Sequence, residues 1–187
     1  MRSGLQYCVI DNLLFPESLK GFQGINNEVK DHAQEYERLS ESARTELSYP
    51  YKLRALIWEL NSGSFTRLLG HLSNMEALLP DPHLRGGGIL PITADGFSLE
   101  LPAQLTEYKL HHRLTLAVSL DDQWQQEWGA DIHLAKNNQS ASLPNRSGQG
   151  ILIKSCPHTV LGFKPISTLA PRPPRILVVH YYAQTPA

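Results

Sequence analysis

The 187-residue chain lacks the features that typically mark membrane and secreted proteins. Its two cysteines, Cys8 and Cys156, are too few for the disulfide framework of a small secreted domain, and their separation does not match a metal site. No apolar run approaches the ~18 residues that a transmembrane helix needs, and the first residues contain no secretory signal. We therefore expect a cytoplasmic protein with reduced cysteines and no membrane partner.

An excess of charge of either sign is also absent. Seventeen basic and eighteen acidic residues leave a formal net charge of -1. Without a positive excess, nothing in the bulk electrostatics attracts a polyanion, so we expect no nucleic-acid partner. The length and the hydrophobic content of 41% suit a single domain, residues 1–187, with a substantial core.

The first part of the chain predicts one strand followed by helices. Residues 6–10 are rich in β-forming side chains. Pro16 is placed to open a helix that we expect to run to about His32. Two further helices, the second capped by Ser62 or Ser64, are indicated by apolar residues at helical spacing. These residues are Leu53, Leu56, Ile57 and Leu60 in the first, and Phe65, Leu68, Leu69 and Leu72 in the second.

The second part of the chain predicts strands. The clearest is 113–120, in which leucine and valine alternate with smaller or polar residues. Residues 137–150 are polar and predict a loop. Further strands are expected at 96–101, 130–134, 151–154 and 176–182. Helices that precede strands favour an α+β fold or a helix-buttressed β-sandwich over alternating βαβ units.

Several segments occur together in an order typical of one family. Residues 79–83 are followed by the three glycines 86–88, then by residues 96–103, the strand 113–120 and the segment 124–129. This arrangement resembles the 2-oxoglutarate/Fe(II) oxygenases of the prolyl 4-hydroxylase-like type, over nearly the whole chain. The resemblance implies a double-stranded β-helix, or jelly roll, in residues 86–187, buttressed by helices within residues 1–80.

The same resemblance implies an iron site with two of its three ligands replaced. In this family a His-x-Asp motif and a distal histidine hold Fe(II), and an arginine binds a carboxylate of 2-oxoglutarate. Leu101 and Ala103 occupy the His and Asp positions, and neither side chain can coordinate a metal. His158 matches the distal histidine, the only retained ligand and the candidate catalytic residue, and Arg175 matches the cosubstrate arginine. The sequence thus argues against Fe(II) and leaves 2-oxoglutarate as a candidate ligand.

Three functions follow as alternatives. The first is an oxygenase-like protein that is altered or inactive and retains a small-carboxylate pocket at His158 and Arg175. The second is a working hydroxylase in which a histidine from residues 104–112 substitutes for a lost ligand, after a shift in strand register. The third is a ligand-free interaction module whose pocket is filled by Leu101 and its neighbours. A small molecule or a peptide is the expected partner, and the substrate and the oligomeric state are left open.

Each key residue also has a structural interpretation. His158 follows a strand and, without the resemblance, is a loop histidine or a hydrogen-bonding core group. Arg175 is equally well an ion-pair partner, and we expect it to be accessible at the start of its strand. Glu100 should point away from Leu101, because neighbouring residues in a strand face opposite sides. The glycines 86–88 are expected to permit close backbone packing.

Overall fold

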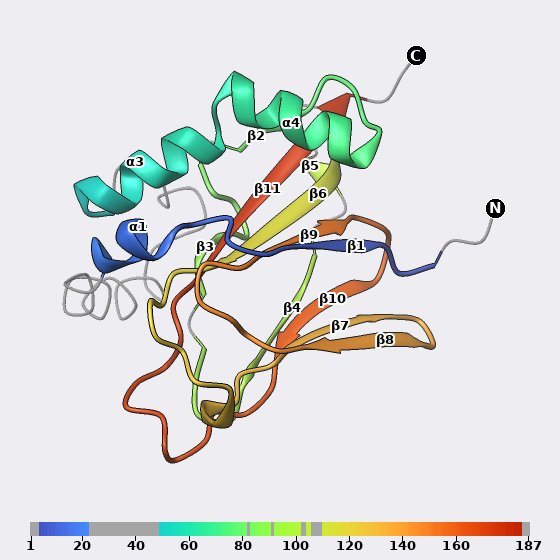
Figure 1. The fold of residues 1–187 in the computed structure, drawn as a ribbon. Helices are drawn as coiled ribbons and strands as arrows, with labels where there is room; N and C mark the ends of the chain where they lie inside the picture. The colour runs from blue at the N-terminus through green and yellow to red at the C-terminus, as the bar shows by residue number, and fades with distance from the viewer. Residues whose placement is uncertain are drawn as a thin grey trace.

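The computed structural model describes residues 4–22, 49–81, 83–90, 92–101, 104–105 and 110–184. It contains two antiparallel sheets, and helices cover the outer face of the larger one (Figure 1). The larger sheet consists of β1 (Tyr7–Ile10), β2 (Leu79–Pro80), β3 (Gly88–Ile89), β5 (Gln104–Leu105), β6 (Leu110–Ser119), β9 (Gly150–Lys154) and β11 (Ile176–Gln184). The smaller sheet consists of β4 (Phe97–Glu100), β7 (Ile132–Lys136), β8 (Gln139–Leu143) and β10 (Thr159–Phe163).

The strand order is that of a jelly roll, as the sequence predicted. The main path of the larger sheet is β1-β9-β6-β11-β2, with β3 also paired to β11 and β5 to β6. The smaller sheet has the order β4-β10-β7-β8. The chain passes between the sheets repeatedly, at β3–β4, β4–β5, β6–β7 and at each step from β8 to β11, which makes two facing layers from one winding chain.

The helices are α1 (Pro16–Lys20), α3 (Tyr51–Leu60), α4 (Gly63–Ser73) and the short 3-10 helix η5 (Gln126–Trp128). The two predicted amphipathic helices are confirmed as α3 and α4, and the Ser62 side chain caps α4 by accepting the Phe65 N–H at 3.2 Å. The helix expected from Pro16 ends at Lys20 in the structure, and residues 23–48 lie outside the described ranges. Every helix within those ranges is too short or too polar to span a bilayer.

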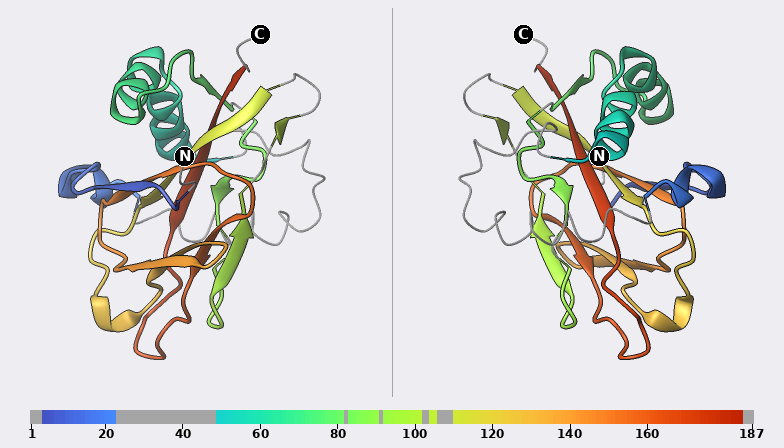
Figure 2. Two further views of the ribbon diagram at one scale, coloured as in Figure 1. Left: turned by 90° about the vertical axis from the view of Figure 1, so that its right-hand side faces the viewer. Right: turned by 90° about the vertical axis from the view of Figure 1, so that its left-hand side faces the viewer.

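Two apolar cores separate the three layers, which Figure 2 shows from the sides. One core lies between the helices and the larger sheet and contains Leu53, Ile57 and Leu116, all fully buried. The other lies between the two sheets and contains Leu134, Ile151 and other aliphatic side chains. The predicted alternation over residues 113–120 is confirmed, because the leucines and the valine of this segment lie in the first core while Ala117, on the other face, lies in the second.

The prediction of a polar loop over residues 137–150 was wrong in part. Residues Gln139–Leu143 form β8, which makes a hairpin with β7 around Asn137, a residue in the left-handed region at φ 52°. Ala141 and Leu143 pack against the core between the sheets, while Ser140 and Ser142 are exposed. The strand carries only these two inward apolar residues. Its composition is therefore mostly polar, and the alternation of apolar and polar residues that is typical of a strand was not recognised in the sequence.

Candidate functional site

Leu101 lies directly after β4, beside the start of β10. Its N–H donates to the Thr159 carbonyl oxygen at 2.9 Å, so the two chain segments that the resemblance assigns to the metal ligands are neighbours. The Leu101 side chain is only 4% exposed and belongs to the apolar core between the sheets, together with Ile153 and Leu161. Ala103 lies outside the described residues.

His158 lies in the turn between β9 and β10, with φ in the left-handed region at 61°. Its side chain is 79% exposed, and its Nδ1 is 3.3 Å from the Glu100 Oε1 atom. Glu100 is itself 64% exposed and points away from the core that holds Leu101, as the alternation predicted. Solvent screens this pair, so it contributes little to stability.

Arg175 precedes β11 and is buried, with 6% of its surface exposed. Its Nε donates to Asp121 Oδ1 at 3.0 Å and its backbone N–H to Oδ2 at 2.9 Å, while Nη1 donates to the Phe22 carbonyl oxygen. Arg172 also donates to the Asp121 carboxylate. The expectation that Arg175 is accessible was wrong, because a buried carboxylate at the end of β6 pairs with it. These contacts agree with the interpretation of Arg175 as an ion-pair partner.

The structure does not bring His158 and Arg175 together. Leu120 donates its N–H to the Arg175 carbonyl oxygen at 2.9 Å, at the end of the larger sheet where β9 begins at Gly150. His158 follows Lys154, at the opposite end of β9. Within the described ranges, the two residues also share no hydrogen-bond partner.

A buried chain of polar side chains, which sequence reasoning missed as a group, links β6 to β11. Thr115 Oγ1 lies 2.9 Å from His180 Nδ1 and 3.0 Å from His112 Nε2. His180 Nε2 is 3.0 Å from the Gly86 carbonyl oxygen, and His112 Nε2 is 2.9 Å from that of Leu114. Since a carbonyl only accepts, both Nε2 atoms must carry a proton. The Thr115 hydroxyl then donates to the unprotonated Nδ1 of neutral His180.

A β-bulge explains why His112 joins this chain. Leu114 pairs with Tyr181, but the next pair is His112 with Tyr182, so Arg113 is the extra residue. A shift of one residue exchanges the two faces of a strand. Because of the bulge, the His112 side chain lies on the same face of the sheet as the Tyr182 side chain, and the centroids of the two rings are 5.3 Å apart. The register therefore shifts at His112, and the shift brings this imidazole to Thr115 and His180.

Burial controls the protonation of this cluster. Desolvation lowers the pKa of fully buried His180, and the hydrogen bond to Gly86 and the charge of Asp81 oppose this effect only in part. Desolvation, with a contribution from Asp81, raises the pKa of Tyr182. The Tyr182 hydroxyl is buried and has no hydrogen-bond partner in the part of the chain that the structure describes. Both side chains are therefore neutral near pH 7.

The polar cluster does not form a metal site. Across the described ranges, no group of three or more His, Cys, Asp or Glu side chains is arranged to hold a metal ion. Both ring nitrogens of His180 are already engaged in hydrogen bonds, and His112 Nε2 is engaged as well. Coordination by these imidazoles would require the chain of hydrogen bonds to be broken.

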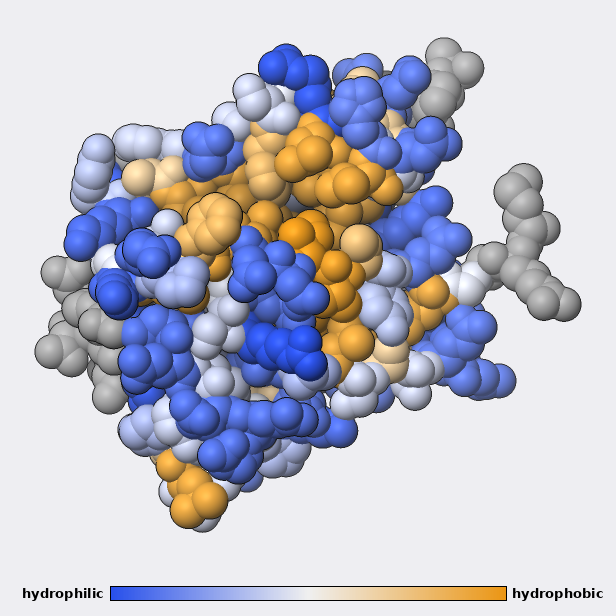
Figure 3. Space-filling model, viewed as in Figure 1, coloured by the Kyte–Doolittle hydropathy of each residue, from blue (hydrophilic) through white to orange (hydrophobic). Residues whose placement is uncertain are grey.

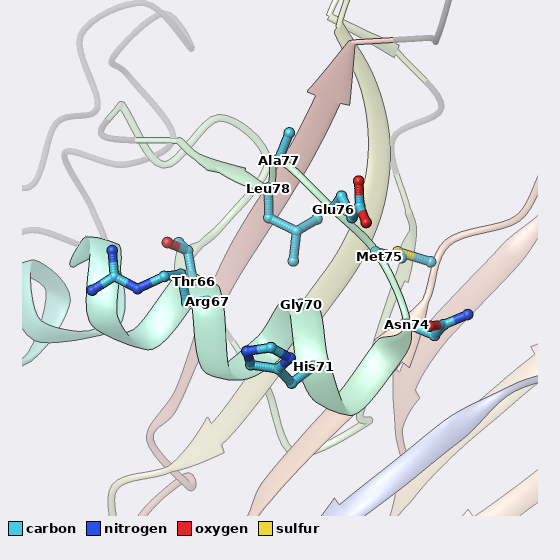
Figure 4. A pocket seen from close by; sticks show the side chains of 9 residues that line it. All are labelled: Thr66, Arg67, Gly70, His71, Asn74, Met75, Glu76, Ala77 and Leu78. Carbon is cyan, nitrogen blue, oxygen red and sulfur yellow. The ribbon is translucent and has the colours of Figure 1, made fainter.

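Besides a cavity of about 220 Å³ lined by Arg113 and Ala183, two cavities in the described part of the chain border α4. One, of about 400 Å³, is formed by α4 and the segment that follows it, and Figure 4 shows Arg67, His71 and Glu76 around it. The other, of about 180 Å³, lies between α4 and β1, and Leu72 and Lys154 contribute to its walls. Neither cavity is lined by the predicted site residues.

No protein-family model matches the chain, and neither does the sequence of any curated protein. Solved structures do match, including the viral collagen prolyl hydroxylase of Paramecium bursaria Chlorella virus-1, with a TM-score of 0.58 and 12% identity over 96% of this chain and 90% of that one. HygX from Streptomyces hygroscopicus with iron bound gives a TM-score of 0.54 and 14% identity over 97% and 83% of the two chains. The Pseudomonas putida prolyl-4-hydroxylase gives 0.53 and 7% over 97% and 87%.

These similarities extend over nearly the whole chain and show the fold. The two antiparallel sheets match the double-stranded β-helix of the 2-oxoglutarate/Fe(II) oxygenases. HygX has also been solved with nickel and 2-oxoglutarate bound. At such low sequence identity, the structural match supports the assignment of the fold but does not assign an activity.

Proposed function

We propose that this protein uses the oxygenase jelly roll as a scaffold for interaction with a partner and does not carry out iron-dependent oxygenation. The observation that supports this proposal is the position of Leu101. Its side chain fills part of the core between the sheets, beside Thr159, where the resemblance expects the first metal-binding histidine. Of the three functions that the sequence allowed, this arrangement is the one expected of a ligand-free module.

The remaining candidate ligands do not compensate for the loss. Fe(II) in this family is held by three side chains on one face, which leaves positions open for cosubstrate and oxygen. Leu101 supplies an aliphatic group, Ala103 in the sequence supplies a methyl, and the His158 imidazole is exposed beside Glu100. The residues present therefore do not fit the iron site of the family.

A small carboxylate at Arg175 is a second candidate, favoured by one observation. Arg175 Nη2 is buried and has no hydrogen-bond partner among the described residues, so this nitrogen of the guanidinium is unused there. An incoming anion would, however, have to approach a cation that is already paired with Asp121. Electrostatic repulsion from that carboxylate makes this binding weak.

Metal and cosubstrate binding separate these functions. The protein should be loaded anaerobically with Fe(II), analysed for bound metal, and tested for succinate formation and for a thermal shift with 2-oxoglutarate. The interaction module predicts no stoichiometric iron, no succinate and no shift. Iron at one equivalent together with succinate would overturn the proposal. A shift with 2-oxoglutarate in the absence of iron would favour the second candidate.

A reconstructed motif provides the matched control. The double substitution Leu101→His and Ala103→Asp places the family's residue types at both positions. If the two replacements are what prevents iron binding, this variant should bind more Fe(II) than the wild type under the same loading. Equal binding of Fe(II) by both proteins would show that positions 101 and 103 do not decide metal affinity, and the proposal based on Leu101 would be wrong.

A further inference from the structure

We infer that this chain pairs with a second copy of itself through the outer edge of β1. Within the described part of the chain, β1 is the last strand on its side of the larger sheet, and its only strand partner is β9. A strand at such a position offers unpaired backbone N–H and C=O groups to another chain. This inference does not depend on whether the protein binds iron.

The backbone groups that face outward can be identified from the pairing with β9. Lys154 donates its N–H to the Gln6 carbonyl oxygen at 3.0 Å, so this is a hydrogen-bonded pair. Such pairs alternate along an antiparallel ladder. Cys8 therefore directs its backbone groups toward β9, and the N–H and C=O groups of Tyr7 and Val9 point away from it. Closer to the N-terminus, the Leu5 N–H is already bonded to Gln139 Oε1 at 2.7 Å.

Apart from its short length of four residues, the edge of β1 lacks the usual protection against pairing. Natural edge strands carry charges, prolines or bulges that prevent association with another strand. The segment Gln6–Ile10 contains no charged residue and no proline, and its register with β9 is regular. Tyr7 is 40% exposed, and Cys8 is exposed as well. This edge is therefore open, uncharged and rich in β-forming residues.

A second copy fits this edge because the outward backbone groups are symmetric about Cys8, and the one partner that the described residues give them, a Cys8 thiol 3.7 Å from the Val9 carbonyl oxygen, is weak and lies on a rotatable side chain. In an antiparallel pair with a two-fold axis at Cys8, Tyr7 lies opposite Val9 of the second copy, and Val9 lies opposite Tyr7. All the outward groups of these two residues are then paired. A shift toward the N-terminus would require the Leu5 N–H, which is engaged, and a shift the other way meets the turn at Asn12, where φ is 54°.

Apolar side chains beside the edge extend the contact. Figure 3 shows hydrophobic surface that continues from α4 across the region of β1. Leu68 and Leu72 on α4 are 49% and 57% exposed, and Leu72 and Cys8 line the same cavity of about 180 Å³. A standard interface buries roughly 800 Å² per partner, more than a four-residue strand edge supplies. The exposed leucines must contribute, and we expect a dissociation constant in the micromolar range.

Charge does not oppose this association. The net charge is -1, so two copies experience little long-range repulsion. The strand itself carries no charge that would be brought face to face across the axis. A dimer should therefore depend only weakly on salt, which distinguishes it from contacts made by charged surfaces.

Sedimentation of the full chain over about 1–200 μM tests the inference, since this range brackets a micromolar dissociation constant. The wild type should shift from monomer to dimer as the concentration rises. Val9→Pro removes an outward N–H without removing a bond to β9, and it should weaken dimerisation by tenfold or more. Val9→Ala is the matched control, because it also truncates the side chain but keeps the N–H, and it should still dimerise. Circular dichroism should confirm that both variants fold.

Cross-linking provides a readout that does not depend on the proline variant. Cys8 faces Cys8 of the second copy at a non-hydrogen-bonded position, where Cα atoms lie about 4.5 Å apart. Mild oxidation should give a covalent dimer that Cys8→Ser abolishes and Cys156→Ser preserves. A wild type that remains monomeric at 200 μM, or a dimer unaffected by Val9→Pro, would overturn the inference. A dimer lost equally in Val9→Ala would place the contact in side chains instead of the strand edge, which also overturns it.

Discussion

Thr115 and His180 are joined side chain to side chain across neighbouring strands, with 2.9 Å between Oγ1 and Nδ1. Both residues are fully buried. The Thr115 oxygen also lies 3.0 Å from His112 Nε2, so a single hydroxyl satisfies two imidazoles. A buried polar network of this kind stabilises only while each member keeps its partner.

Removal of the hydroxyl should therefore destabilise the fold. Thr115→Val preserves the shape of the side chain but leaves the His180 Nδ1 acceptor and the His112 donor with one partner fewer. We expect a loss of about 1–3 kcal/mol in the free energy of unfolding, measured by urea denaturation. Thr115→Ser keeps the hydroxyl and is the control, with a smaller loss. Full retention of stability by Thr115→Val would contradict a stabilising role of the hydroxyl, and a loss in Thr115→Ser as large as in Thr115→Val would show that the hydroxyl matters no more than the methyl group.

His180 should make stability depend on pH below about 6.5, its ordinary pKa. Burial lowers the pKa of His180 in the folded protein, so between the two pKa values only the unfolded chain binds the proton. The free energy of unfolding should fall as the pH drops through this window, by at most about 1.4 kcal/mol per pH unit from this group. Above pH 6.5 the group is neutral in both states and contributes no pH dependence.

The measurement is a series of denaturation curves between pH 5 and pH 8. His180→Gln keeps a donor for Gly86 and an acceptor for Thr115 but does not titrate, so its profile should be flatter below pH 6.5. The other histidines are common to both proteins, and the difference between the profiles isolates His180. Parallel profiles would contradict the assignment.

Arg175 should be important for stability because it pairs with a fully buried carboxylate. Arg175→Ala removes the Nε bond to Asp121 and leaves that carboxylate with Arg172 as its charged partner. Loss of one partner from a buried pair costs about 3–5 kcal/mol. Arg146→Ala is the control, because the Arg146–Asp11 pair is exposed at 3.9 Å and should cost less than about 1 kcal/mol. Similar melting temperatures for the two variants would disprove this role.

Gly87 should not tolerate a side chain. A Cβ atom at this position would lie 2.6 Å from the Val178 carbonyl oxygen and 3.4 Å from the His180 ring. Because the nearest atom is backbone, the 81–88 segment must shift away from β11, and we expect Gly87→Ala to cost about 2 kcal/mol or more. At Gly63, at the start of α4, a Cβ would make only an ordinary contact with Arg67 Nη1 at 3.8 Å, so Gly63→Ala should be neutral or slightly stabilising. Thermal melts of both variants provide the comparison.

The sequence alone determined the layer of helices, most of the strands and, through its resemblance to a family, the jelly roll. These features depend on local periodicity, such as the helical spacing of Leu53, Ile57 and Leu60 or the alternation of apolar residues in 113–120. Such periodicity can be recognised directly in the sequence. The close packing expected of the glycines 86–88 is also confirmed at Gly87. The chemical identity of Leu101 and Ala103, and with it the argument against iron, is visible without coordinates.

The tertiary structure decided which side chains meet. The bulge at Arg113 turns His112 toward His180, and Asp121 binds Arg175, 54 residues away. Strand β8 and the open edge of β1 depend in the same way on which strands become neighbours. Periodicity assigns a residue to a face of its own strand, but a hydrogen bond or a buried ion pair requires two segments in one register. That register is set by the packing of the whole sheet.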